Sequence, residues 1–241
     1  MSQPFAVFDI DGTIFRSSLF LEVIYRGTHK KVLPSIINSD IKNAYDKWLK
    51  RKSSTAYEEY INCTVESFDR NLAGVNVNKL QIIAKEIVDE YHEHTYVYTR
   101  DLLKSLKEQG YFLIAITGSI EEVAIEFTKR YGFDYVRPTY LDKKDGKYSG
   151  TYNIADDKKQ SELAKIVEQN KLTYKGSYAI GDSSSDIGML ALVENPIAFN
   201  PDKILFKEAS KEAWKIVIER KNMIYQLEVK NGSYILAETN A

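Results

Sequence analysis

The amino-acid sequence predicts an α/β protein with a parallel sheet and helices on both faces of that sheet. After Tyr98, short apolar runs typical of buried strands alternate with segments of helical periodicity. Such alternation requires crossover connections, which place neighbouring strands parallel and helices over both faces. Two further signals complete the prediction: a long helical stretch ahead of Tyr98, and an alternating apolar pattern near the C-terminus that is typical of a hairpin.

The predicted strands are short and mostly apolar, as expected for strands that are buried on both faces. They cover residues 5–8, 111–116, 177–180, 196–199 and 214–218. Helical spacing of apolar residues predicts helices over 102–107, 159–168 and 186–192. Gly110 stands just past the first of these helices, where glycine commonly ends a helix. Ser119 and Glu122 have the spacing of a capping box, so another helix is expected to begin at Ser119.

The stretch from residue 16 to residue 95 is predicted to be a helical insertion. It contains a single proline, Pro34, and its apolar residues recur at helical spacing, which indicates helices around 44–49, 57–68 and 80–91. We therefore expect a core domain formed by residues 1–15 and 96–241, with residues 16–95 as a helical cap.

Two hairpins are also predicted. Residues 133–153 carry Asp145-Gly146, a strong turn signal, at their centre. Near the C-terminus, alternating runs between residues 224 and 237 flank Asn231-Gly232. This register would place Val229 opposite Tyr234 and Leu227 opposite Leu236, giving a C-terminal β-hairpin.

Composition and charge exclude several classes of protein. Of the 241 residues, 44% are hydrophobic and 28% are charged, which is globular rather than disordered usage. The net charge of −1 disfavours nucleic acid as the main partner. Cys63 is the only cysteine, so no internal disulfide forms, as is usual in a reducing compartment. The N-terminus lacks a signal pattern and no apolar run approaches the roughly 18 residues of a membrane span, so a cytoplasmic protein without membrane contact is expected.

Unusual polar residues stand where the predicted strands end or close by, with Lys158-Lys159 at the start of the helix that precedes the third of these strands. They are Asp9-Ile10-Asp11-Gly12-Thr13, Thr117-Gly118-Ser119, Lys158-Lys159 and the run from Gly181 through Asp182 to Asp186. The carboxyl ends of parallel strands meet at one edge of a sheet, which is where such proteins bind ligands. Clustered carboxylates need a cation, and hard oxygen ligands without thiols favour Mg²⁺. A magnesium ion, a lysine and the amides at a helix start together suit a phosphoryl group.

The spacing of Asp9 and Asp11 allows the two carboxylates to have different catalytic roles. A turn beginning at Ile10 would separate the two side chains, so that one carboxylate attacks phosphorus while the other handles the proton of the leaving oxygen. Gly12 allows the tight turn that this requires.

These residues resemble the haloacid-dehalogenase-like phosphohydrolase superfamily, which has four ordered motifs and a Rossmann-like core. The first motif, DxDx[TV], is matched by Asp9, Asp11 and Thr13, and the second, a hydroxyl residue at a strand end, by Thr117. The third is a lysine ahead of the acidic loop, and the fourth is a GDxxxD-type loop that begins at Gly181. The resemblance covers residues 4–220, and phosphoserine-phosphatase-like members carry a helical cap between the first two motifs.

The resemblance implies a role for each matching residue. Asp9 would be the nucleophile and Asp11 the general acid and base. Magnesium would be held by Asp9, the main-chain carbonyl of Asp11 and Asp182, with Asp186 close by. The phosphoryl oxygens would be bound by Thr117, Gly118 and a lysine, for which Lys159 is preferred because it stands four residues before Leu163; Lys158 is the alternative.

The sequence also departs from the phosphoserine phosphatases of this superfamily. Those enzymes usually read DxDST, have Gly-Gly after the hydroxyl of motif two, and carry a substrate-contacting glutamate nine residues past the nucleophile. Here Gly12 replaces the serine, Gly118-Ser119 follows Thr117, and Ser18 takes the place of the glutamate. The core chemistry is untouched, whereas phosphoserine is not established as the substrate.

Three functions agree with these patterns to different degrees. The first is a Mg²⁺-dependent phosphatase that acts on a small phosphorylated metabolite through an aspartyl-phosphate. The second is a phosphotransferase that passes the same phosphoryl group to another hydroxyl. The third, a receiver-like signalling module, is disfavoured because receiver domains are about half as long and lack the insertion. The oligomeric state and the role of the C-terminal hairpin stay open.

Overall fold

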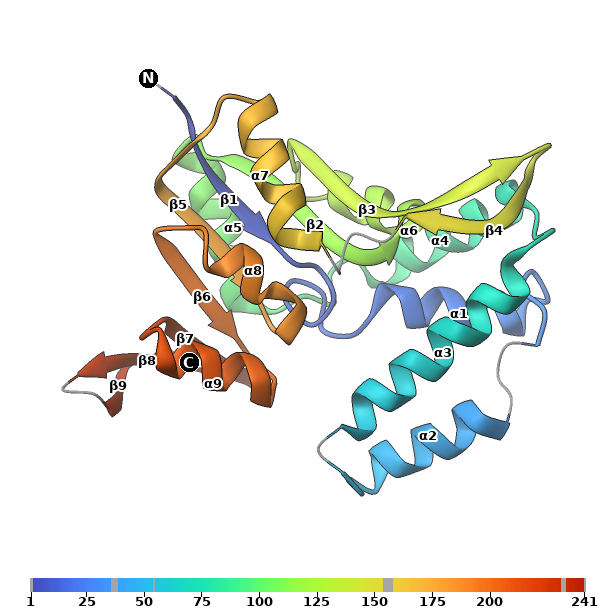
Figure 1. Cartoon of the computed structure of the whole chain (residues 1–241), viewed down its shortest axis with the longest axis horizontal. Coiled ribbons are helices and arrows are strands. Elements are labelled where there is room, and N and C mark those ends of the chain that lie inside the picture. The colour runs from blue at the N-terminus through green and yellow to red at the C-terminus, as the bar shows by residue number, and fades with distance from the viewer. Residues whose placement is uncertain (1, 36–38, 54, 154–157, 231–232, 241) are drawn as a thin grey trace.

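A computed structural model describes residues 2–35, 39–53, 55–153, 158–230 and 233–240 (Figure 1). Within this part of the chain, nine strands form one sheet in the order β4-β3-β2-β1-β5-β6-β7-β8-β9. The six consecutive strands β3, β2, β1, β5, β6 and β7 pair in parallel. At the two ends of the sheet, β4 pairs antiparallel with β3, β8 with β7, and β9 with β8. The strands are β1 (Pro4–Phe8), β2 (Phe112–Ile120), β3 (Tyr135–Lys144), β4 (Lys147–Asn153), β5 (Thr173–Gly181), β6 (Asn195–Phe199), β7 (Lys215–Arg220), β8 (Met223–Lys230) and β9 (Ser233–Asn240).

The central strand β1 shows why the core is parallel and covered on both faces. Ala6 and Phe8 are fully buried in one hydrophobic cluster, and Phe5 and Val7 are fully buried in the other. Side chains alternate between the faces of a strand, so an unbroken apolar run requires a covering layer on each side. The α/β prediction with a parallel, Rossmann-like core is confirmed.

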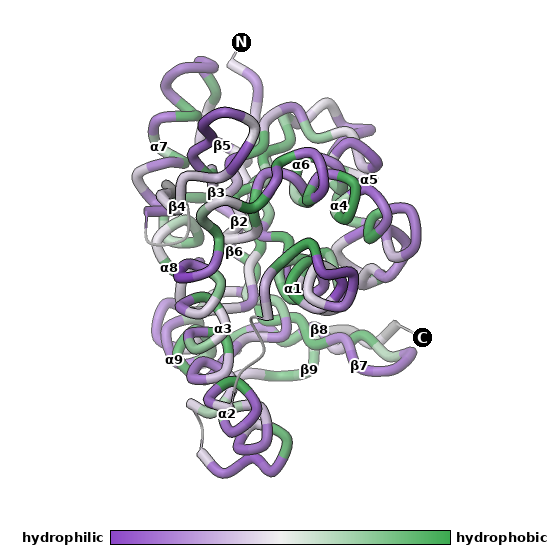
Figure 2. Tube along the Cα trace, turned by 90° about the vertical axis from the view of Figure 1, so that its right-hand side faces the viewer, coloured by the Kyte–Doolittle hydropathy of each residue, from purple (hydrophilic) through white to green (hydrophobic). Residues whose placement is uncertain are grey.

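The helices divide between the two faces of the sheet. Helices α1 (Leu19–His29), α4 (Val77–Tyr91), α5 (Val97–Glu108) and α6 (Glu121–Lys129) contribute to the cluster that contains Phe8. Helices α7 (Lys159–Gln169), α8 (Ile187–Leu190) and α9 (Lys203–Lys211) contribute to the cluster that contains Val7. Figure 2 shows that the apolar residues of these helices lie mostly on the side that faces the interior and the hydrophilic residues mostly on the outer side. None of the helices in the described part of the chain combines the length and the apolar character that a membrane span requires.

The inserted stretch between residues 16 and 95 is mostly helical, but its helices do not all lie together. Helices α1 and α4 pack against each other and against α6, on the sheet. Helices α2 (Ser39–Leu49) and α3 (Ala56–Leu72) instead form a pair that stands off from the sheet (Figure 1). Helix α1 was not among the predicted helices. The division into a core domain and a cap with boundaries at residues 16 and 95 stays a prediction.

The β3–β4 hairpin joins the outer helix pair to the sheet. The Gly74 amide donates to the Tyr148 carbonyl at 2.9 Å, and the Tyr148 amide donates to the Val75 carbonyl at 3.0 Å. The predicted hairpin over residues 133–153 is confirmed. Both Asp145 and Gly146 at its tip have positive φ angles, 50° and 72°, as a type I′ turn requires.

The predicted C-terminal hairpin is also confirmed, including its register. Leu227 lies opposite Leu236 and Val229 lies opposite Tyr234, as the alternation predicted. The Asn231-Gly232 tip lies outside the described residues. β8 and β9 continue the sheet beyond β7 as antiparallel strands, with β9 at the edge.

The predicted capping box at Ser119 is wrong. Strand β2 continues to Ile120, which pairs with Thr139 of β3, so helix α6 begins only at Glu121 and Ile120 is its N-cap, without a side-chain cap. The predicted helix over 186–192 is likewise shorter, because Ser184–Asp186 forms a 3-10 turn and α8 covers only Ile187–Leu190.

Candidate active site

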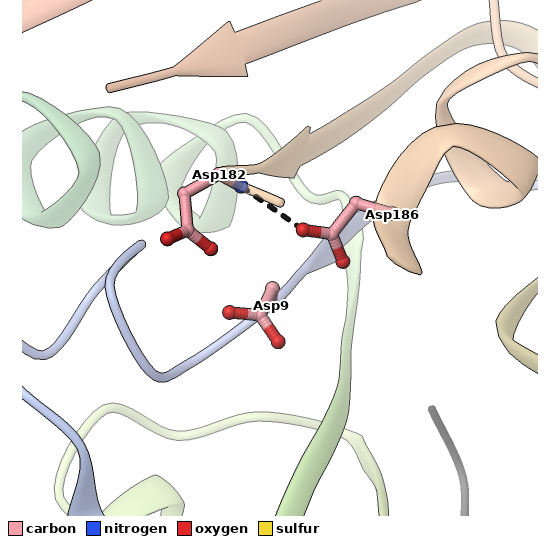
Figure 3. A group of neighbouring side chains, drawn as sticks. All are labelled: Asp9, Asp182 and Asp186. Carbon is pink, nitrogen blue, oxygen red and sulfur yellow. Dashed lines mark hydrogen bonds between the residues drawn. The ribbon is translucent and has the colours of Figure 1, made fainter. Parts of the chain in front are cut away.

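The carboxyl ends of the three central strands bring the polar sequence motifs to one place. Asp9 directly follows β1, Thr117 lies in the last part of β2, and Asp182 directly follows β5. Lys159 is the first residue of α7, and Asp186 closes the 3-10 turn after β5. Figure 3 shows the carboxylates of Asp9, Asp182 and Asp186 gathered between these elements.

Lys159 lies at the centre of the carboxylates. Its Nζ donates to Asp9 Oδ1 and to Asp186 Oδ1, each at 2.8 Å, and its side chain is 2% exposed. Lys158 is exposed and has neither of these contacts. Of the two lysines considered from the sequence, the structure therefore places Lys159 among the acidic residues.

Asp186 shapes the loop that carries Asp182. Its Oδ2 accepts hydrogen bonds from the amides of Asp182 and Ser183, both at 3.0 Å, and from the Ser183 hydroxyl at 3.2 Å. Both Asp186 oxygens are therefore engaged, one with the loop and one with Lys159. These bonds hold the Asp182 backbone at the end of β5, so that its carboxylate faces Asp9.

The donor set fits a divalent cation. One carboxylate oxygen from each of Asp9, Asp182 and Asp186 lies within 4.8 Å of the others. Together with the ammonium of Lys159, three ionised carboxylates would leave two negative charges, which a divalent ion balances. The oxygens are hard ligands without thiols or imidazoles, as Mg²⁺ prefers.

The pKa values of the clustered carboxyl groups also indicate that a cation would stabilise their ionised forms. Burial raises the pKa of the Asp9 carboxyl well above its ordinary value; Lys159 lowers this pKa, and the neighbouring carboxylates raise it. Burial also raises the pKa of Asp182, as does Asp186, whereas Lys159 and the Thr13 hydroxyl at 3.3 Å lower it. A bound divalent cation would lower both pKa values and keep the two carboxylates ionised.

Asp11 is held away from the three clustered carboxylates. Its Oδ2 accepts hydrogen bonds from the hydroxyls of Thr117 at 3.1 Å and Ser119 at 2.6 Å, and its Oδ1 accepts one from the Leu19 amide. Its carboxylate is not part of the candidate metal group. The predicted metal contact of Asp11 through its main-chain carbonyl stays a prediction.

Ser119 is a site residue whose contact the sequence analysis missed. It was interpreted as a helix cap, whereas its hydroxyl donates to Asp11 and its amide donates to Thr117 Oγ1 at 3.0 Å. The extension of β2 through Ile120 causes this difference, because it keeps Ser119 in the strand beside Thr117. The spacing of the two hydroxyl residues, with one residue between them, is the only signal that the sequence offers for this pairing.

Ser18 acts as a helix cap. Its side chain accepts a hydrogen bond from the Leu21 amide at 3.3 Å and it is 8% exposed. The sequence position at which phosphoserine phosphatases carry a substrate-contacting glutamate is therefore occupied here by the N-cap of α1.

Gly12, between Asp11 and Thr13, has a φ angle of +79°, in the left-handed region that favours glycine. A Cβ atom at this position would lie 2.2 Å from Asp182 Oδ2. We expect Gly12→Ala to lower stability by about 1–2 kcal/mol through backbone strain and also to displace Asp182, reducing activity at least tenfold.

Gly110→Ala is the matched control for this substitution. Gly110 has a φ angle of +81°, and a Cβ there would meet no atom within 4 Å. Thermal unfolding and Mg²⁺ titration of both variants separate strain from displacement. Equal Mg²⁺ affinity in the two variants would show that the contact with Asp182 has no consequence.

A cavity of about 360 Å³ opens between the acidic residues and helix α3. Tyr57 lines it from α3, and burial together with the charges of Asp11 and Asp182 raises the pKa of the Tyr57 hydroxyl to about 12. The Tyr57 hydroxyl therefore stays protonated at neutral pH, as an ordinary phenol does. The cavity gives the site a defined space for a small molecule, in which α3 forms the wall opposite the strand ends.

A parallel α/β core with carboxylates and a lysine at the strand ends defines a class of proteins that bind phosphoryl groups with a divalent cation, and comparison with known proteins identifies the family. The profile of the haloacid dehalogenase-like hydrolases matches residues 6–191, and the chain belongs to this family. The resemblance stated from the four motifs is thereby confirmed.

Several curated relatives are named as phosphatases. The chain is 24% identical over 208 residues to the histidinol-phosphatase of Neisseria meningitidis serogroup C (strain 8013), covering 76% of this chain and 94% of that protein. It is 28% identical over 126 residues to the phosphoserine phosphatase of Methanocaldococcus jannaschii, covering 51% of this chain and 57% of the relative. Two mycobacterial relatives are also matched over only 52% of their own length.

Solved structures share the fold. A protein of unknown function from Bordetella pertussis Tohama I has a TM-score of 0.69 at 18% identity, over 91% of this chain and 99% of that one. A phospho-aspartyl intermediate analogue of phosphoserine phosphatase has a TM-score of 0.61 at 21% identity, over 92% of this chain and 95% of that one. At these identities the likeness concerns the fold.

Proposed function

We propose that this protein is a Mg²⁺-dependent phosphatase that hydrolyses a small phosphomonoester through an aspartyl-phosphate on Asp9. The observation that carries the proposal is the group of Asp9, Asp182 and Asp186, whose carboxylate oxygens lie within 4.8 Å of one another, at the end of the cavity. The buried Lys159 joins it through hydrogen bonds of 2.8 Å to Asp9 and to Asp186. Such a group matches the charge of a phosphoryl ester, because it combines a cation-binding carboxylate set with an ammonium group. The phosphatase relatives support the same reaction class.

Each residue has a definite part in the proposed reaction. A carboxylate oxygen of Asp9 attacks phosphorus, the ester P–O bond breaks, and the leaving oxygen takes a proton from Asp11. Asp11 then removes a proton from water, the water oxygen attacks phosphorus, and the bond to Asp9 breaks to release inorganic phosphate. Magnesium, held by Asp9, the Asp11 carbonyl and Asp182, would supply positive charge against the phosphoryl oxygens.

The remaining site residues would bind the phosphoryl oxygens. Thr117 is fully buried with its hydroxyl facing Asp11, and Gly118 and Ser119 line the cavity beside it. Lys159 would neutralise charge on the same oxygens. Asp186 would act through its hydrogen bonds to Lys159 and to the loop of Asp182.

The test is phosphate release from a panel of phosphomonoesters, with Mg²⁺ and with EDTA. The panel includes phosphoserine and histidinol phosphate, the esters that the names of the two relatives point to. We expect release that is lost with EDTA and restored by added Mg²⁺. Release that persists unchanged in EDTA would contradict the metal dependence.

Phosphotransfer is distinguished in the same reactions by adding glycerol as an acceptor. The proposed hydrolysis yields inorganic phosphate equal to the alcohol released. An excess of alcohol over inorganic phosphate, with glycerol phosphate as the balance, would instead assign a phosphotransferase.

The helical stretch is proposed to act as a cap. Within residues 16–95, helix α3 lines the cavity and pairs with α2, so closure of these two helices over the carboxylates would exclude water and contribute specificity. The cytoplasmic location, and the expectation that neither nucleic acid nor membrane is a partner, stay predictions from the sequence.

A further inference from the structure

The wall of the cavity that lies away from the carboxylates is mostly apolar. Helix α3 supplies it with residues spaced three and four apart, which lie on one face of the helix. Phe20 of α1 packs edge-on against Phe68 of α3, with ring centroids 5.3 Å apart. The apolar residues that line the cavity are Phe20, Ile61, Val65, Phe68, Ile120 and Leu141.

Away from the carboxylates that would hold the metal, no basic side chain among the described residues lines the cavity. Lys159 is the only basic residue that lines it, and this lysine is engaged by Asp9 and Asp186. The residues outside the described part of the chain include no lysine, arginine or histidine, so they supply no basic side chain either. A carboxylate carried into this cavity would lose its hydration without gaining an ion pair, which is unfavourable.

The same wall does carry a negative charge. Asp69 stands two helical turns after Asn62 on α3, and both residues line the cavity. Asp69 is partly buried and lies on α3, whereas the carboxylates of the candidate metal group follow strands β1 and β5. A cationic group on the substrate would find a charged acceptor there.

We infer that the cavity selects phosphomonoesters whose alcohol carries an amine and an apolar body but no carboxylate, with Asp69 as the specificity residue for the amine. The inference rests on the proposed phosphatase function and adds the class of substrate to it. Phosphoserine is disfavoured, because its carboxylate would lie in the part of the cavity that holds Asp69, where no basic side chain of the described residues pairs with it while Mg²⁺ and Lys159 bind the phosphoryl group.

Three matched esters test the inference. Ethyl phosphate, phosphoethanolamine and phosphoserine share a two-carbon alcohol; the second adds an amine, and the third adds an amine and a carboxylate. We expect kcat/KM for phosphoethanolamine to exceed that for phosphoserine at least tenfold. A value for phosphoserine equal to or above that for phosphoethanolamine would overturn the inference.

The role of Asp69 is tested by Asp69→Asn, which removes the charge and keeps the size. The ratio of kcat/KM for phosphoethanolamine to that for ethyl phosphate should fall about tenfold. Glu66→Gln is the matched control, because Glu66 is on the same helix but does not line the cavity, and it pairs with Arg70 at 2.9 Å. An unchanged ratio in Asp69→Asn, or an equal fall in Glu66→Gln, would refute the assignment.

A binding measurement separates this inference from the proposed function. If none of the three esters is hydrolysed, the phosphatase proposal fails for these esters, while calorimetric binding to the Mg²⁺-loaded protein still tests the cavity. Tighter binding of phosphoethanolamine than of phosphoserine supports the inference, and the reverse order contradicts it.

Discussion

Asp9→Asn is expected to lower kcat for phosphate release at least about a thousandfold, the largest effect of any single substitution considered. The amide is a poor nucleophile, and no other carboxylate takes the place of Asp9, since Asp182 and Asp186 follow a different strand and Asp11 is held by Thr117 and Ser119. Initial rates with a saturating ester measure the effect.

Unfolding measurements show that this loss is chemical rather than structural. Burial raises the pKa of Asp9, Lys159 lowers it and the neighbouring carboxylates raise it, and the balance is a raised pKa. A neutral side chain of the same shape therefore removes an unfavourable buried charge, and Lys159 keeps its hydrogen bond to Asp186. We expect the Tm of the metal-free variant to equal or exceed that of the wild type. Activity within about tenfold of the wild type would rule out Asp9 as the nucleophile.

Lys159→Met should have the second-largest effect on phosphate release and the largest effect on the free energy of unfolding. It removes the only ammonium group in contact with Asp9 and Asp186 within the described residues, and leaves their buried carboxylates without that countercharge. Breaking a buried ion pair from one side costs about 3–5 kcal/mol, which for a chain of this size lowers Tm by roughly 6–20 °C. Phosphate release should be lost as well. Thermal unfolding in EDTA measures the first effect, and initial rates with Mg²⁺ measure the second.

Lys158→Met is the control, because Lys158 is the neighbouring lysine but is exposed. It should leave Tm and activity close to the wild type. A larger loss of activity in Lys158→Met than in Lys159→Met would reverse the assignment of the phosphate-binding lysine.

The features that were predictable from the sequence are those set by local patterns. The unbroken apolar run of β1 requires two covering layers, and the alternation around Asn231-Gly232 determines which residues face each other in the C-terminal hairpin. The site was predictable for a related reason: its acidic and hydroxyl residues stand at or just after strand ends, its lysine begins a helix, and the carboxyl ends of parallel strands meet at one edge.

The features that were missed depend on contacts between distant segments. Helix α1 was overlooked, and its apolar residues are buried against α4 and α6, which are remote in sequence. Ser119 was assigned to a helix cap because local propensity favours one, yet pairing of Ile120 with β3 extends the strand instead. Asp69 was not singled out because nothing near it in the sequence shows that α3 faces the carboxylates.

The most direct test of the covalent mechanism uses Asp11→Asn with p-nitrophenyl phosphate. The good leaving group needs no proton from Asp11, so phosphoryl transfer to Asp9 proceeds, while the variant lacks the base that activates water for the second step. The account predicts a burst of nitrophenolate equal to the enzyme concentration, with the phosphoryl group on Asp9 after rapid quenching, reductive cleavage and peptide sequencing. Nitrophenolate and inorganic phosphate that appear together without a burst, or a phosphoryl group on another residue, would contradict it.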